Sequence, residues 1–173
     1  MVSVRDTDSH EALQVLYDRY RKRLFGFVFR MLNDSEPSKD IIQDVFLKIY
    51  QNRQRFNSNY RFYSWIFTIT RNTTLKKLRD EGRHQDITEN LGLTDNRSAS
   101  FNLEQKELSQ QIEEAIQLLT PPHKEVVIMR FIHKMQLADI AKLIDCSEGT
   151  VKSRLFYATQ QLTELLKQEY INH

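Results

Sequence analysis

The chain has 173 residues, of which 40% are hydrophobic and 28% are charged, a balance typical of a packed globular fold and not of disorder. Its four glycines and three prolines are too few for an all-β sandwich or barrel, so we expect a helical protein. A single cysteine excludes an intrachain disulfide and a cysteine-based zinc site. No apolar run reaches the roughly 18 residues of a membrane span. The polar N-terminus is unlike a secretory signal, so we expect a cytoplasmic protein.

The net charge of +2 conceals an uneven distribution along the chain. Residues 53–83 contain eight lysines and arginines and two acids, a local charge of +6. Residues 84–116 contain seven acids and two basic residues, a local charge of −5. A basic block beside an acidic one indicates a polyanionic partner for the basic block. Two solvated surfaces of opposite sign would give the same pattern, so charge alone leaves both interpretations open.

Two helices are expected before the basic block. Apolar residues recur at steps of three and four over residues 11–32, which predicts one long helix. A turn at 33–35 is followed by Pro37, which fits the first turn of a second helix over about 36–52. One face of this second helix is apolar and should be buried. The opposite face carries one apolar residue among polar ones: Asp40, Gln43, Asp44 and Leu47.

The basic block is expected to form a polar loop and a third helix. Residues 53–60 contain two aromatics in a polar context, and residues 61–79 show helical periodicity. From residue 80 to residue 100 this periodicity stops, and so long a stretch does not fit a loop inside one compact domain. We therefore expect an all-α protein of two small domains joined by a flexible linker. The buried side of the third helix should hold Phe62, Trp65, Ile66 and Ile69.

The second domain is expected to begin near residue 101 and to contain a helix-turn-helix. Thr120 is a good N-cap and a proline follows it, so a helix should begin there. The segment 137–156 has a small residue, Ala141, where two helices would cross, and Ser147 to cap the second of them. Outward side chains of that helix suit base edges and phosphates in a major groove, although a plain helical hairpin would show the same pattern. They are Glu148, Thr150, Lys152, Ser153, Arg154 and Tyr157.

Three runs of residues, taken together, resemble a known family. They are SKDIIQDVFLKIY at 38–50, RFYSWIFTITRNTTLKKLR at 61–79 and LTPPHKEVVIMRFIHKMQLADIAKLIDCSEGTVKSRLFYATQQL at 119–162. In this order they resemble the extracytoplasmic-function (ECF) sigma factors of bacterial RNA polymerase. The resemblance implies a region-2 domain over 1–80, a linker over 81–104 and a region-4 domain over 105–173.

The resemblance also implies partners and a function. The protein would direct core RNA polymerase to promoters and help to melt promoter DNA, with no enzymatic activity, no cofactor and no metal. Region 2 would bind the β′ clamp and the −10 element, and region 4 would bind the β flap and the −35 element. An anti-sigma factor would be a further partner.

Particular residues match the motifs of this family. The clamp-binding stripe matches Asp40, Gln43, Asp44 and Leu47. The loop 53–60 matches the base-capture loop, with Phe56 and Asn57 as candidates to receive an unstacked −10 base. The full −10 set is Arg55, Phe56, Asn57, Tyr63, Trp65, Arg71, Asn72 and Lys76. For Trp65, the apolar stripe predicts a core position as well. The −35 set is Ser147, Glu148, Thr150, Lys152, Ser153, Arg154 and Tyr157.

Two positions depart from the usual pattern of the family. Asp145 stands where the turn usually has glycine, and Asp tolerates the left-handed backbone better than most residues. Gln136 stands where serine or threonine usually caps the first helix of the motif, and this weaker cap costs about 1 kcal/mol. Cys146, beside the turn, occupies a core-facing position and should act as a small hydrophobe.

Two other classes of function compete with the sigma-factor interpretation. A DNA-binding regulator would use only the helix-turn-helix, and would leave the aromatics and cations of 53–79 without a purpose. An enzyme would need a recognisable catalytic pattern. The sequence has no His-Glu-x-x-His motif, no phosphate-binding glycine loop and no carboxylates paired by spacing, and its five histidines are scattered.

Overall fold

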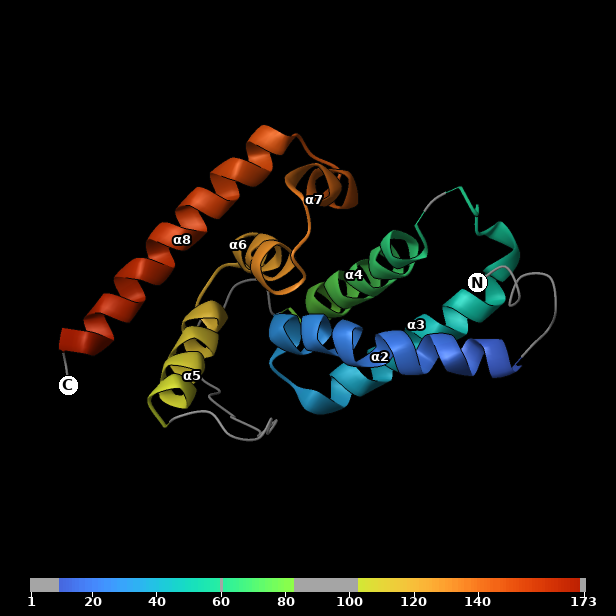
Figure 1. Cartoon of the computed structure of the whole chain (residues 1–173), viewed down its shortest axis with the longest axis horizontal. Coiled ribbons are helices and arrows are strands. Elements are labelled where there is room, and N and C mark those ends of the chain that lie inside the picture. Colours follow the sequence, from blue (N-terminus) through green and yellow to red (C-terminus); the bar gives the residue numbers. More distant parts are fainter. Residues whose placement is uncertain (1–9, 60, 83–102, 172–173) are drawn as a thin grey trace. The chain divides into compact units, whose positions relative to one another are not determined.

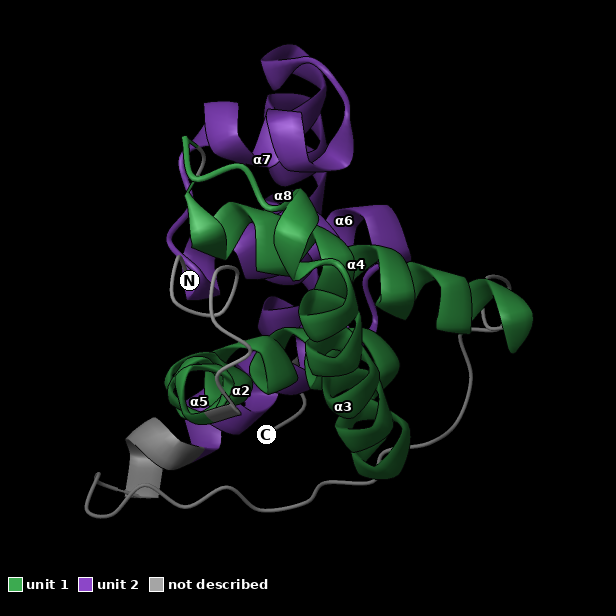
Figure 2. Cartoon of the chain, turned by 90° about the vertical axis from the view of Figure 1, so that its right-hand side faces the viewer, with its two compact units in different colours: residues 1–85 green, residues 86–173 purple. Residues whose placement is uncertain are grey.

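The computed structural model describes residues 10–59, 61–82 and 103–171 (Figure 1). Within these ranges every regular element is a helix, which confirms the all-α prediction. The chain divides into two compact units, residues 1–85 and 86–173 (Figure 2), and the division falls within the segment that was predicted as a linker. Most of that segment, residues 83–102, lies outside the described residues.

The described residues of the first unit form three long helices and one short 3₁₀ turn. They are α2 (His10–Leu32), α3 (Ser35–Gln51), η1 (Arg53–Arg55) and α4 (Phe62–Asp80). The turn between α2 and α3 has Asn33 at φ 55, and Asp34 then caps α3 by accepting a hydrogen bond of 3.2 Å from the Glu36 amide. Each of α2, α3 and α4 packs against the other two.

The core of the first unit is built on large side chains from all three helices. Phe27 of α2 and Phe67 of α4 have no exposed surface, and their ring centroids lie 4.7 Å apart. Val45 and Ile49 of α3 are equally buried. Burial of each such side chain stabilises the unit by about 1.5–3 kcal/mol, so this cluster fixes the three helices relative to one another.

The buried face of α4 differs from the predicted one. Of the four predicted residues only Ile66 is fully buried. Phe62, Trp65 and Ile69 are half-buried, whereas Thr70 and Thr74 have no exposed surface. Each threonine hydroxyl donates to the carbonyl one turn earlier, to Ile66 and Thr70 respectively, at 2.9 Å. Because both hydroxyls form hydrogen bonds within the helix, the two threonines can be buried without leaving an unpaired polar group in the core.

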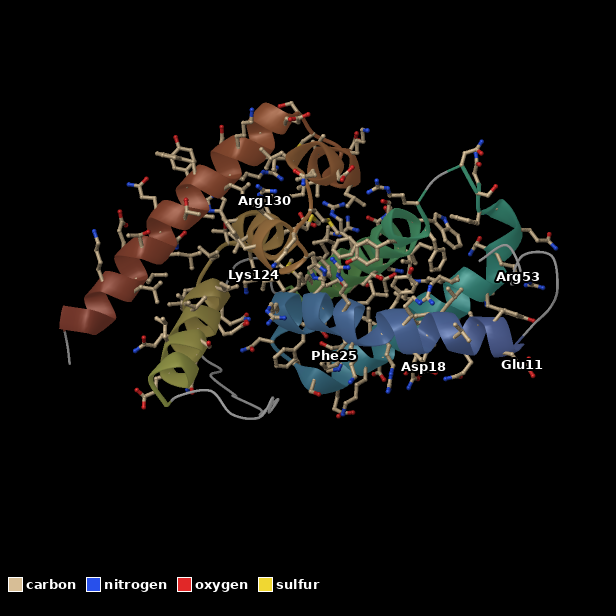
Figure 3. All side chains as sticks on the ribbon, in the orientation of Figure 1. Glu11, Asp18, Phe25, Arg53, Lys124 and Arg130 are labelled. Carbon is tan, nitrogen blue, oxygen red and sulfur yellow. The ribbon has the colours of Figure 1, made fainter. Side chains whose placement is uncertain are left out.

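The second unit is organised around its last and longest helix. Its elements are α5 (Leu103–Gln117), α6 (Pro121–Val127), the π-helical segment η2 (Ile128–Ile132), α7 (Leu137–Ile144) and α8 (Glu148–Ile171). Helix α8 packs against α5, α6 and α7. Arg130, labelled in Figure 3, donates to the Met135 carbonyl at 2.9 Å and so ties η2 to the segment that leads into α7.

One lysine lies within this unit instead of on its surface. The Lys124 side chain of α6 (Figure 3) is 9% exposed, and its ammonium donates to Gln117 Oε1 of α5 at 2.9 Å. Burial lowers the pKa of Lys124 from its ordinary value of 10.5 to about 8. Desolvation of the charged form is the cause, because a lone ammonium is better solvated by water than by one amide oxygen.

This lysine predicts a distinct dependence of stability on pH. Below pH 8 the ammonium is charged in both states, and the folded state carries the full cost of its burial. Between pH 8 and 10.5 the folded state loses this proton before the unfolded state does, so the free energy of unfolding should rise with pH. Lys124→Met should remove the rise and increase stability at pH 7 by roughly 1–3 kcal/mol. Denaturant unfolding at several pH values would measure both effects.

The exposed Lys142 of α7 offers a matched control. Lys142→Met should leave the pH profile of the wild-type protein unchanged. An identical rise between pH 8 and 10.5 in the wild-type protein and in Lys124→Met would contradict the assignment to Lys124.

Candidate nucleic-acid interface

The outward face of α3 combines polar residues with one strongly exposed apolar residue. Leu47 is 60% exposed, while Val45 and Ile49 on the other side of the helix have no exposed surface. Asp40 and Gln43 are exposed, and Asp44 is half-buried. Non-obligate protein interfaces combine apolar and polar side chains in this way, so this face is a candidate protein-binding surface.

A lysine at the edge of this face connects it to α4. Lys48 Nζ lies 2.7 Å from Asp44 Oδ2 and donates to Thr73 Oγ1 of α4 at 3.1 Å. The Asp44 carboxylate is therefore held by a cation that is itself bonded to the neighbouring helix. This arrangement limits the positions that Asp44 can take.

The loop after α3 differs from the prediction at Phe56. This ring is 5% exposed and packs against Phe62 at 5.7 Å and Trp65 at 5.2 Å between centroids. It therefore anchors the loop to α4 and does not present a surface on which a base could stack. The neighbouring Asn57 is exposed, and its Oδ1 accepts a hydrogen bond of 3.0 Å from the Asn59 amide. Arg55 is exposed as well.

Helix α4 presents polar and cationic groups along the face opposite to its core. Asn72 and Lys76 are exposed at a spacing of four residues, and Arg71 is half-buried with its Nη1 3.4 Å from Asn72 Oδ1. Trp65 is half-buried between Phe56 and Phe62, so it contributes to packing and keeps part of its ring on the surface. Amide and cationic groups at this spacing suit base edges and phosphates of a single strand.

Tyr63, at the start of α4, is enclosed more than a base-stacking residue would be. Its ring contacts Phe67 at 5.7 Å and Tyr20 of α2 at 6.0 Å, and the Arg23 guanidinium lies 4.5 Å from its centroid. Burial raises the pKa of Tyr63 to about 12, and the nearby Arg23 partly offsets this rise. The phenol therefore stays neutral above the pH at which an exposed tyrosine with a pKa of 10.0 ionises.

The predicted helix-turn-helix is present in the second unit. Helix α7 ends at Ile144, and its C-cap Asp145 adopts the left-handed conformation at φ 53 and ψ 56. The Cys146 amide donates to the Ala141 carbonyl at 3.0 Å. Ser147 Oγ then accepts a hydrogen bond of 3.0 Å from the Thr150 amide and caps α8. Val151 is fully buried. Cys146 is half-buried, so it is less enclosed than the prediction required.

The solvent face of α8 carries most of the residues predicted for the duplex. Thr150 and Arg154 are half-buried, and the other members of the predicted set are exposed: Ser147, Glu148, Lys152, Ser153 and Tyr157. Phe156, which the sequence analysis did not include, is 64% exposed and makes an edge-to-face contact with Tyr157 at 5.5 Å. Phe156 lies three residues after Ser153 and four after Lys152, and residues at these spacings share one face of a helix, so the sequence could have predicted its place on this surface.

The described residues show neither a metal site nor a membrane-spanning helix. Within them, no three side chains of His, Cys, Asp or Glu are grouped as metal ligands would be. No helix among them is both long and apolar enough to cross a membrane.

Comparisons with known proteins agree with this geometry. The families described as Sigma-70 region 2 and Sigma-70, region 4 match residues 16–84 and 109–162. The RNA polymerase sigma-H factor of Pseudomonas aeruginosa is 26% identical over 167 residues, which cover 90% of this chain and 86% of that protein. The ECF RNA polymerase sigma factor SigW of Bacillus subtilis is 25% identical over 168 residues, covering 91% and 90%.

A solved structure shows the same fold. The sigma factor RpoE from Bartonella quintana, crystallised with the anti-sigma factor NepR, aligns with a TM-score of 0.75 at 23% identity, covering 91% of this chain and 98% of that one. The two matched regions define a sigma factor, a transcription initiation factor that is not a classical enzyme. The chain belongs to the ECF group of RNA polymerase sigma factors, and the resemblance found in its sequence is thereby confirmed.

The cap of α8 gives a test of the helix-turn-helix geometry. Ser147→Ala removes the hydrogen bond that Ser147 Oγ accepts from the Thr150 amide, together with its 3.0 Å hydrogen bond with the Thr150 hydroxyl, and should cost about 1 kcal/mol of stability. Hydrogen exchange of the first α8 amides would measure the loss locally, and denaturant unfolding would measure it globally.

Thr120 provides the matched control for this substitution. It occupies the N-cap position of α6, as predicted, but its side chain makes no capping hydrogen bond. Thr120→Ala should therefore change the free energy of unfolding by less than about 0.5 kcal/mol. If both variants lowered the free energy of unfolding equally, the hydrogen bond to Ser147 would not be the source of the stability.

Proposed function

We propose that this sigma factor uses three surfaces to start transcription at its promoters. The outward face of α3 binds the β′ clamp of core RNA polymerase. The loop after α3 and the polar face of α4 bind the melted −10 element, and the exposed face of α8 binds the −35 duplex. The single observation that carries the proposal is the exposed Leu47 in a polar stripe, on a helix whose other face is fully buried. An apolar side chain among polar ones is the mixture that a non-obligate protein interface shows.

The clamp surface is supported by both charge and shape. Asp40, Asp44, Gln43 and Leu47 combine two carboxylates with an apolar centre, a mixture that favours a basic protein surface with an apolar pocket. The bond between Lys48 and Asp44 keeps one carboxylate in a defined place before the partner arrives.

The −10 surface is supported by the exposed amides and cations of the first unit. Asn57 and Asn72 each offer a donor and an acceptor to a base edge. Arg55, Arg71 and Lys76 supply charge for phosphates. Phe56 has a different role in this proposal, because its buried ring positions the loop that carries Asn57. Trp65 and Tyr63 support the surface mainly through packing.

The −35 surface is supported by the solvent face of α8. Lys152, Ser153 and Arg154 follow the capped start of the helix, the part that enters a major groove in helix-turn-helix proteins. Phe156 joins this set, because an exposed aromatic on the same face can contact thymine methyl groups or sugars.

Two further features of the proposal come from the family. RpoE was solved with the anti-sigma factor NepR, and CnrH with the cytosolic domain of CnrY. We propose an anti-sigma factor as a regulator of this chain as well. We also propose a cytoplasmic location, because promoter DNA and RNA polymerase are found there.

The clamp surface is tested by removing its apolar and acidic groups together. The double variant Asp44→Ala and Leu47→Ala should weaken binding to core polymerase by about 1–3 kcal/mol, ten- to hundredfold, because two central contacts are lost. Pull-down of core enzyme and run-off transcription with and without the protein would measure the effect. The fold should be unchanged, since Leu47 packs little against the core.

A matched pair on α2 controls for loss of charge and apolar surface. Asp18 and the 57% exposed Val15 offer the same two chemical types away from α3. Asp18→Ala with Val15→Ala should bind core enzyme like the wild-type protein. Unchanged pull-down by the α3 double variant would refute the clamp assignment. Promoter binding that needs no polymerase would favour an ordinary DNA-binding regulator.

The −35 surface is tested by two cations of α8. Arg154→Ala should cost about 1–3 kcal/mol and relax specificity at one base pair if the guanidinium reads a guanine edge. Lys152→Ala should weaken binding to all sequences and lower the salt dependence, as loss of a phosphate contact does. Titrations on matched and mismatched duplexes, chosen by selection from a random pool, would separate the two. Lys167→Ala, near the far end of α8, should have neither effect.

A further inference from the structure

Helix α2 carries a strongly basic segment outside the block that the sequence analysis singled out. Residues 19–30 contain five lysines and arginines and no acid. At about 100° per residue, Arg19, Arg23 and Arg30 project along one line of the helix, and Lys22 lies beside that line. Arg19, Lys22 and Arg23 are exposed and Arg30 is half-buried. We call these four residues the α2 basic stripe.

A glycine brings two members of the stripe closer together. Arg30 Nη1 donates to the Gly26 carbonyl at 3.1 Å, which folds the guanidinium back by one turn toward Arg23. A Cβ atom at position 26 would lie 3.2 Å from the same nitrogen. The absence of a side chain at Gly26 therefore leaves the space that Arg30 occupies.

Arg23 connects the stripe to the start of α4. Its guanidinium lies 4.5 Å from the centroid of the Tyr63 ring. A cation over an aromatic face is attracted by the ring quadrupole, so Tyr63 defines where this charge lies. The aromatic contacts then continue from Tyr20 to Phe62 at 5.4 Å and from Phe62 to Phe56 at 5.7 Å. Asn57 of the candidate base-binding loop follows directly in the chain.

The remaining arginine of the segment lies on another side of α2. Arg21 is within 3.9 Å of Asp18 and lies 5.5 Å from the centroid of the Tyr17 ring. The nearest acid in the chain before the stripe is thus engaged by a residue that is not part of it. Arg21 carries the same charge as Arg23 and is also exposed, but it projects from another side of the helix.

We propose that the α2 basic stripe binds the phosphates of single-stranded nucleic acid, with Arg23 as the residue that continues the strand from α4 onto α2. This inference rests on the proposed −10 function of the first unit, and extends it to a helix for which no nucleic-acid contact was expected. The stripe holds cations and no amide side chain, so it binds the sugar–phosphate backbone and does not discriminate between bases. Its contribution should depend on strand length and on salt.

The test compares Arg23→Gln with Arg21→Gln in the full-length protein. The probes are fluorescent oligo-dT strands of about five and about fifteen nucleotides, which span the usual range of single-strand site sizes. Arg23→Gln should weaken binding of the longer strand about three- to tenfold and lower its salt slope by about 0.7, the value for one phosphate contact. Binding of the shorter strand should change less than twofold. Arg21→Gln should bind both strands like the wild-type protein, and Arg23→Lys should keep the wild-type salt slope.

The outcomes separate this inference from the function on which it rests. If Arg23→Gln and Arg21→Gln weakened binding of the longer strand equally, only the net positive charge would matter, and the inference would be overturned. An unchanged Arg23→Gln, or a wild-type protein that binds neither strand, would overturn it as well. Asn72→Ala reports on the base-binding surface alone. If it has no effect while Arg23→Gln weakens the longer strand, the stripe stands and the proposed surface on α4 is wrong.

Discussion

The packing of α3 against both α2 and α4 is the constraint on which the surfaces of the first unit depend. Val45 and Ile49 have no exposed surface, so α3 cannot rotate about its axis without opening the core. This fixes which side chains face water, including Leu47. Lys48 sits at the boundary and bonds to Asp44 on its own helix and to Thr73 on α4. One packing arrangement therefore positions both the proposed polymerase surface and the proposed strand surface.

The positions of the helices could be predicted because periodicity and capping are local properties. The turn at Asn33, the cap at Ser147 and the left-handed Asp145 all follow from the preferences of single residues, and the structure contains each of them. The buried threonines of α4 could not be predicted in this way. A hydroxyl counts as polar in a hydrophobic pattern, and only the bond to the preceding turn shows that it belongs in the core.

The candidate site was less predictable, because exposure depends on contacts between elements. Phe56 follows a polar loop sequence, yet Phe62 and Trp65 of α4 enclose its ring. Phe156 differs in the opposite sense, since this large apolar side chain of α8 is 64% exposed. The link between Arg23 and Tyr63 joins residues forty positions apart. A scan for charge along the chain treats them as separate regions, and only the packing of α2 on α4 brings them together.

The left-handed backbone at Asp145 restricts how this part of the chain can vary. With φ at 53 and ψ at 56, the position favours glycine, asparagine and aspartate, whereas a β-branched side chain would clash with its own backbone. In related sequences, few residue types should therefore occur at position 145, although the side chain is exposed to solvent. Exposure alone would lead one to expect a freely variable site. Here the crossing of α7 and α8, and with it the direction of α8, depends on the backbone conformation of this one exposed residue.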